Sequence, residues 1–323
     1  MMQIGLISLG SGAAAALLFA TIASGSVLSI ILCSLAPMPI IIAALGWTHW
    51  AGLIAAVGAA CALGLIFGGD FLLTFLLGIG LPAWWLGYLA MLARPVQSDA
   101  AGLVEWYPAG RLVMWAALLS ALSVIIAIPN FGLDGDSFRN GLRNLFESAI
   151  RARMEIPANA PLTIPGISDA GKFLDVLVAL TPGVAAVLGT MTNLINLWLA
   201  GRVVKLSGLL RRPWPDLSAM ELPKFSGALL LAAFAASFTE GLAGVIGNAA
   251  SASLLMAFAV LGLAVLHTIT RGMDARPFVL VGAYVAVCVF GWPVLALSLL
   301  GLAESVFYIR KRLAHRRGPP APT

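Results

Sequence analysis

Long apolar runs fill the chain almost from end to end, and polar residues gather in short gaps between them. Runs such as 53–67 and 254–266 do not alternate between apolar and polar residues, as the strands of a membrane barrel would. A helix needs roughly 20 mostly apolar residues to cross a bilayer and pairs its own backbone groups there. The pattern therefore predicts an all-α, polytopic transmembrane helical bundle. We expect about ten spans, near 5–23, 27–46, 51–67, 70–92, 110–128, 173–201, 225–240, 247–269, 276–290 and 292–309.

Two places leave the number of spans open between about 8 and 10. The run 225–240 is short, and 276–309 forms two spans only if the chain turns near Gly291 and Pro293. We expect residues 1–313 to form a single integral membrane domain. The Pro-rich end of the chain, 314–323, has too few apolar residues to pack and should be a disordered cytoplasmic tail.

Composition supports a membrane protein and excludes a soluble one. Hydrophobic residues make up 60% of the 323 residues, charged residues make up 10%, and the mean hydropathy is +0.98. The net charge of +5 comes from Lys and Arg in the gaps, so we expect contact with the lipid bilayer and no nucleic-acid partner. The three cysteines lie in apolar runs without paired spacing, which predicts neither a disulfide framework nor a metal site.

The distribution of Lys and Arg predicts an orientation in a bacterial inner membrane, because cytoplasmic loops are enriched in these residues. The basic gap 202–224 and the basic end 310–317 should be cytoplasmic, and alternation of the spans then makes both termini cytoplasmic. The gap 129–172 should lie outside although it contains several arginines. It is the exception to the rule.

Residues 131–172 form the longest gap and should be an extramembrane loop. Apolar residues recur near helical spacing between 138 and 154, with arginines among them, which predicts an amphipathic helix before the sixth span. Two interpretations remain open. The helix lies flat on the membrane surface, or it forms a cap on the end of the bundle.

Polar residues inside spans are rare and costly, so each one is a candidate functional residue. Asn196, His267 and Glu304 stand in three spans that run in the same direction. Each lies four to six residues before the first basic residue that follows it, which places all three about 6–9 Å inside the cytoplasmic boundary. Asn193 shares a helix face with Asn196.

Two interpretations of this polar layer remain open. The layer binds a polar ligand group or relays a proton, or its members join neighbouring helices by hydrogen bonds. Glu304 has a third possibility, because it can turn toward the interface and pair with Arg310 or Lys311.

Prolines interrupt several spans, at Pro37, Pro39, Pro82 and Pro182. A proline removes one backbone donor and disturbs the carbonyl four residues earlier. Such helix breaks line the binding sites of many transporters. The alternative is a kink whose backbone groups a neighbouring helix satisfies.

Catalytic motifs are absent from the sequence. It contains no G-x-S-x-G, no H-E-x-x-H and no Gly-rich phosphate loop ending in Lys-Ser or Lys-Thr. We therefore expect no enzyme activity, no cofactor and no ATPase within this chain. Active transport would then depend on an ion gradient or on a partner membrane or ATPase subunit.

Three stretches of the second half carry a family resemblance. The resemblance is best over residues 173–313. The three stretches are Pro182 with the Asn193–Asn196 run and the basic exit 202–208, the Gly-Leu-Ala-Val-Leu-His run 262–267, and the Gly-Leu-Ala-Glu run 301–304 with Arg-Lys-Arg-Leu at 310–313. They resemble the uncharacterised bacterial YybS-like membrane proteins, in which the acidic position of the last motif is more usually Asp. The first half is similar mainly in hydropathy and in Gly87 and Tyr88.

That family is similar, more distantly, to the substrate-binding components of energy-coupling-factor vitamin transporters. The resemblance implies a role in binding or transporting a small molecule. In those transporters a small-xxx-small motif on the first helix docks a scaffold subunit, and Ala16 and Ala20 match it loosely. The alternative is a non-transporting membrane scaffold that recruits an envelope or cytoplasmic partner through the amphipathic segment and the basic tail.

Overall fold

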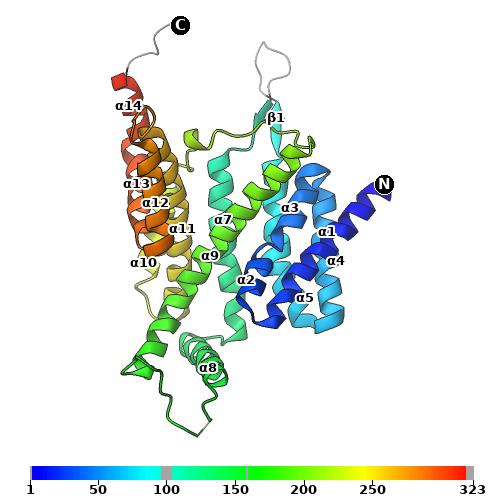
Figure 1. Cartoon of the computed structure of the whole chain (residues 1–323), viewed down its shortest axis with the longest axis vertical. Helices are drawn as coiled ribbons and strands as arrows, with labels where there is room; N and C mark the ends of the chain where they lie inside the picture. The colour runs from blue at the N-terminus through cyan, green and yellow to red at the C-terminus, as the bar shows by residue number, and fades with distance from the viewer. Residues whose placement is uncertain (1, 96–103, 158, 318–323) are drawn as a thin grey trace.

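The computed structural model describes residues 2–95, 104–157 and 159–317, and almost all ordered elements in this part of the chain are helical (Figure 1). The elements are α1 (Met2–Ala20), η1 (Thr21–Ser24), α2 (Val27–Ser34), α3 (Pro37–Gly46), α4 (His49–Phe67), α5 (Gly69–Phe75), η2 (Leu76–Gly80), α6 (Leu81–Ala90), β1 (Ala93–Pro95), β2 (Val104–Trp106), α7 (Ala109–Ala127), η3 (Ile128–Asn130), α8 (Gly135–Met154), α9 (Ala170–Leu206), η4 (Leu217–Ala219), α10 (Ser226–Ala236), α11 (Gly241–Ile269), α12 (Arg276–Phe290), α13 (Pro293–Phe307) and α14 (Ile309–Arg317).

Seven helical segments of the described chain are long and apolar enough to cross a membrane. They confirm the all-α polytopic prediction, and they correspond to the first six expected spans and the eighth. The other three expected spans are the helices α10, α12 and α13, of 11, 15 and 15 residues. These are shorter than a bilayer crossing requires. The expected turn near Gly291 separates α12 from α13, with Gly291 at φ +70°.

The first half is a bundle of closely packed helices. α1 lies against α4 through small residues, because Gly12 meets the backbone of Ala55 so closely that an added Cβ would lie 2.8 Å from its carbonyl oxygen. Phe19 and Phe75 pack edge to face at 5.2 Å between ring centroids. These contacts belong to one apolar core that extends to α3, α6 and the end of α9.

Two glycines bring α11 and α13 into close contact in the second half. α11 and α13 cross where Gly262 faces the backbone of Leu297 and Gly301 faces the backbone of Phe258. An added Cβ would lie 2.0 Å and 1.9 Å from the respective carbonyl oxygens. Such small residues let two helices approach closely inside a membrane.

Three helices occupy the centre and join the two halves. α7, α9 and α11 pack against one another, and α9 runs obliquely between the N-terminal helices and the group α10–α14 (Figure 1). The short hairpin pairs β1 with β2 in antiparallel register, with Ala93 opposite Trp106. We call the end of the molecule with this hairpin, the loop 207–225 and α14 the hairpin face, and the opposite end the α8 face.

The amphipathic helix predicted at 138–154 is α8, which begins three residues earlier at Gly135. Phe138 and Leu142 are buried against Val178 of α9 and Val245 of α11. Its apolar side therefore covers the end of the bundle, as in the cap interpretation. At the other end of the chain, α14 is helical as far as Arg317, and residues 318–323 of the expected tail lie outside the described residues.

The four prolines differ in their effect. Pro37 begins α3 after a turn that separates it from α2, and Pro39 follows within the first turn of α3. Pro82 stands in the first turn of α6, directly after the wide π turn η2. Pro182 does not break its helix, because α9 continues without interruption from Ala170 to Leu206. The hydroxyl of Thr181 donates to the carbonyl of Leu177 at 2.6 Å, which helps the helix to continue.

Candidate functional site

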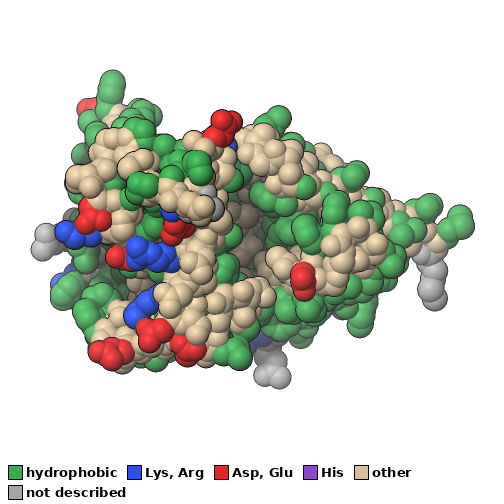
Figure 2. Space-filling model, turned by 90° about the horizontal axis from the view of Figure 1, so that it is seen from below, with side chains coloured by type: hydrophobic (Ala, Val, Ile, Leu, Met, Phe, Trp, Pro, Cys, Tyr) green, Lys and Arg blue, Asp and Glu red, His purple; other side chains and the backbone are tan. Residues whose placement is uncertain are grey.

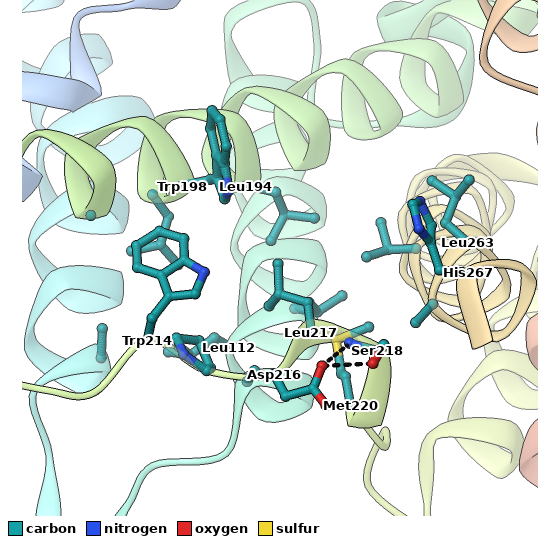
Figure 3. A pocket seen from close by; sticks show the side chains of 18 of the residues that line it. Leu112, Leu194, Trp198, Trp214, Asp216, Leu217, Ser218, Met220, Leu263 and His267 are labelled. Carbon is teal, nitrogen blue, oxygen red and sulfur yellow. Dashed lines mark hydrogen bonds between the residues drawn. The ribbon is translucent and has the colours of Figure 1, made fainter. Parts of the chain in front are cut away.

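A large pocket lies between the two halves of the molecule, next to the hairpin face. Its volume is about 1000 Å³, at the upper end of the range for small-molecule sites. α9 contributes one face, with Leu194, Trp198 and Gly201 at helical spacing. α11 contributes Leu263 and His267 opposite (Figure 3). The walls are mostly apolar, and the polar side chains that line them are Arg212, Asp216, Ser218, His267, Arg271, Arg276 and Tyr284.

The loop 207–225 forms the base of this pocket by folding back against the end of α9. Gly208, at φ +70°, ends the helix, and the chain then brings the Trp214 ring beside Gly201. An added Cβ on Gly201 would lie 3.4 Å from that ring. The Arg202 guanidinium and the Lys205 ammonium lie 5.6 and 5.3 Å from the ring centroid, within reach of cation–π attraction.

Arg212 attaches the first part of this loop to the N-terminal half. Its guanidinium donates to the carbonyl of Ala90 at 2.9 Å and to the carbonyl of Tyr107 at 2.8 Å. Burial lowers the pKa of Arg212, although an arginine remains charged at neutral pH. These two hydrogen bonds therefore fix a positive charge at the wall of the pocket.

Ser218 attaches the second part of the loop to the C-terminal half. Its carbonyl accepts hydrogen bonds from Arg310 at 2.6 Å and from the Thr268 hydroxyl at 3.2 Å, and its hydroxyl contacts Arg271. Asp216 accepts from the hydroxyl and the N–H of Ser218, and these hydrogen bonds lower the pKa of its carboxyl group. The base of the pocket is thus fixed on both sides.

His267 is the one predicted site residue that lines this pocket. Its Nε2 lies 2.9 Å from the Tyr284 hydroxyl, so the two rings share a hydrogen bond between α11 and α12. Which of them donates depends on the tautomer of the imidazole. Arg271 and Arg276 line the same side of the pocket. An anionic group placed here would meet several donors.

The two asparagines contact other helices. Asn196 donates through Nδ2 to the carbonyl of Ser34 at 2.7 Å, where α2 ends, and also to Thr192 within α9. Asn193 donates to the hydroxyl of Ser120 on α7 at 3.1 Å. Both are buried. Their hydrogen bonds join helices, as in the structural interpretation of the polar layer.

Glu304 pairs with Arg310, which is one of the two partners expected from the sequence. Its Oε1 lies 2.8 Å from Arg310 Nε, and its Oε2 accepts from the Arg310 backbone N–H at 3.0 Å. Within the described part of the chain, no hydrogen bond or ion pair joins any two of Asn196, His267 and Glu304. The equal depth predicted for the three residues therefore does not bring them into a hydrogen-bonded layer.

Sequence reasoning missed most of the pocket. Trp198, Trp214 and Tyr284 line the pocket, but the sequence places Trp198 near the end of the span 173–201, Trp214 in a loop and Tyr284 in the span 276–290, with nothing that singles them out. One signal was available for Trp214, which lies between Pro213 and Pro215 shortly after basic residues. An aromatic residue held between two prolines, next to cations, is suited to a fixed cation–π contact.

A family described as "Predicted membrane protein (DUF2232)" matches residues 13–305. This match covers most of the chain. The protein belongs to the DUF2232 family. The DUF2232 match supports a multi-pass membrane protein, and the YybS-like resemblance and the distant similarity to energy-coupling-factor components stay expectations from the sequence. No curated protein and no solved structure matches the chain.

Proposed function

We propose that this DUF2232 protein binds, and moves across the membrane, a small amphipathic molecule with an apolar body and an anionic head group. The observation that carries the proposal is the pocket of about 1000 Å³ between the two halves, with apolar walls and convergent polar groups. Three arginines and one aspartate line it, so its electrostatic potential favours an anion.

The pocket divides by chemistry in a way that fits such a ligand. Leu194, Trp198 and Leu263 offer an apolar surface to the ligand body, while His267 and Arg276 stand together at the polar side. The Arg276 backbone N–H donates to the Met273 carbonyl, but among the described residues its guanidinium makes no hydrogen bond or ion pair and is available to a ligand. Transport would draw on an ion gradient or on a partner ATPase subunit, as expected from the sequence.

Mass spectrometry of small molecules retained by gently purified protein tests the proposal. The wild type should retain an anionic amphiphile, and His267→Ala and Arg276→Gln should each lose most of it. Asn196→Ala is the matched control, because Asn196 is polar and intramembrane but does not line the pocket. It should retain the compound. A compound retained equally by all four proteins would place it outside this pocket.

The scaffold alternative has one supporting observation. α8 exposes Arg153 and half of the Leu145 side chain at the end of the molecule. Deleting 138–154 would also remove the buried contacts of Phe138 and Leu142, so Leu145→Ser is the sharper variant. A co-purifying protein lost from Leu145→Ser, with no small molecule retained by the wild type, would favour the scaffold.

A further inference from the structure

A second cavity of about 770 Å³ opens at the α8 face, away from the pocket of His267. It lies between α8, the first half of α9 and the start of α11. On α9 its last lining residue is Pro182, whereas the pocket of His267 begins at Leu194. Twelve residues of helix separate them, or about 18 Å. The two cavities are distinct.

Four charged residues stand at the mouth of this cavity, in two pairs of one arginine and one aspartate each. Arg143 of α8 forms an ion pair with Asp175 of α9, and Arg139 lies 3.7 Å from Asp136. All four side chains are at least one-third exposed. Charged side chains gather on one side of this end of the molecule (Figure 2). Because each arginine has a carboxylate beside it, the mouth is close to neutral.

One residue that lines the cavity carries a buried oxygen acceptor without a donor. The side-chain oxygen of Asn248, on α11, is buried and has no hydrogen-bond partner in the described part of the chain. It lies against α9 at Gly183, where an added Cβ would be 2.6 Å from it. Pro182, next to Gly183, has no N–H to donate to the Val178 carbonyl. Val178 and Pro182 both line the cavity.

The kind of ligand follows from these atoms. A buried acceptor without a donor is costly unless a ligand or water satisfies it. Backbone carbonyls without an intrahelical donor are typical ligands of Na⁺ in membrane transporters, and Pro182 leaves the Val178 carbonyl without its usual donor although α9 continues. Divalent cations prefer several carboxylates, and the described residues hold no group of three His, Cys, Asp or Glu that could bind a metal. The two nearby aspartates are engaged with arginines.

We propose that this cavity binds a compact monovalent cation, either Na⁺ or the ammonium group of a small organic solute, at the Asn248 side-chain oxygen and the Val178 carbonyl. The site stands on its own residues and does not depend on a ligand in the pocket of His267. A cation entering from the α8 face would bridge α9 and α11, the two helices that also line that pocket.

Thermal unfolding of the purified full chain tests the site. The melting temperature is measured in NaCl, methylammonium chloride and choline chloride at equal ionic strength. Relative to choline, a bound cation should raise the wild-type Tm by about 2–4 °C at saturation. A rise in NaCl assigns the site to Na⁺, and a rise in methylammonium chloride alone assigns it to an ammonium group. Equal Tm values in all three salts would overturn the proposal.

Variants then locate the effect. Asn248→Leu removes the side-chain oxygen at similar volume and should abolish the cation-dependent rise. Gly183→Ala pushes against the same oxygen and should increase the half-saturating cation concentration several-fold, which provides a second reading if Asn248→Leu does not fold. Ser253→Ala is the control, since Ser253 is buried on α11 but does not line the cavity. A rise that survives in both Asn248→Leu and Gly183→Ala would contradict the site.

Discussion

Arg310 links Glu304 to the loop at the base of the pocket. Tyr308, at φ +51°, turns the chain between α13 and α14, and this turn returns Arg310 to Glu304. The same guanidinium donates to the carbonyls of Ser218 and Met220 at 2.6 and 2.8 Å. The Glu304 and Arg310 side chains are only 6% and 10% exposed. One buried ion pair therefore holds the last helix and the loop together.

Glu304→Gln should destabilise the protein strongly. Removing one partner of a buried pair leaves the other charge uncompensated, which costs about 3–5 kcal/mol. Glu221→Gln is the matched control, because Glu221 pairs with Lys311 at 3.1 Å with both side chains about 60% exposed. The control should lose less than about 1 kcal/mol. Thermal unfolding in detergent compares the two, and equal losses would show that the Glu304 pair contributes little.

Gly301→Ala should separate α11 from α13. The added methyl group would lie 1.9 Å from the Phe258 carbonyl oxygen, so the helices must move apart, at a cost of about 1–3 kcal/mol or more. Gly282→Ala is the control, because Gly282 is also helical but has open space around it. Alanine there should be neutral or stabilising by up to about 1 kcal/mol. Chemical cross-linking between α11 and α13 would follow the separation directly.

Trp214→Ala should release the loop without unfolding the helices. It removes the ring that lies beside Gly201 and faces Arg202 and Lys205. Hydrogen exchange of the backbone over 209–217 should accelerate at least several-fold, while exchange in α9 and α11 stays unchanged. Trp50→Ala is the control, since that side chain is 60% exposed on α4. Unchanged exchange in the loop would mean that Arg212 and Ser218 hold it alone.

Asp216 should make the stability of the loop depend on pH. Its hydrogen bonds with Ser218 lower the folded-state pKa of its carboxyl group below the ordinary value of 3.8. The stabilisation is therefore present above the unfolded-state pKa and is lost as pH falls through the lowered folded-state pKa. Wild type should be more stable than Asp216→Asn at pH 6, and the difference should shrink below about pH 4. A constant difference down to pH 3 would contradict this role.

The helical segments could be predicted because hydropathy reports on them directly. The segment 276–290 matches α12 at both ends, and α11 ends at Ile269 as expected. The number of spans could not be settled in the same way. Hydropathy marks an apolar run, but it does not tell whether a helix of 15 residues crosses a bilayer or packs within part of its thickness.

The polar layer shows the limit of counting residues along a helix. Such a count predicts height along the axis but not direction around it, and successive residues point about 100° apart. Asn196 thus contacts Ser34, while Trp198, two residues later, lines the pocket. The same limit applies to the small-xxx-small motif at Ala16 and Ala20 on α1. The buried side of this helix carries Ser8, Gly12 and Ala15, whereas Ala16 and Ala20 are only partly buried.

The loop between α9 and α10 limits how far the two halves of the protein can separate. Arg212 is fastened to the N-terminal half, and Ser218 is fastened to the C-terminal half by Arg310. Six residues of extended chain reach about 20 Å at most. While both anchors hold, the segment is a connection of fixed maximum length at the base of the pocket. Together with the packing of α7, α9 and α11, this length limits how far the walls of the pocket can move apart.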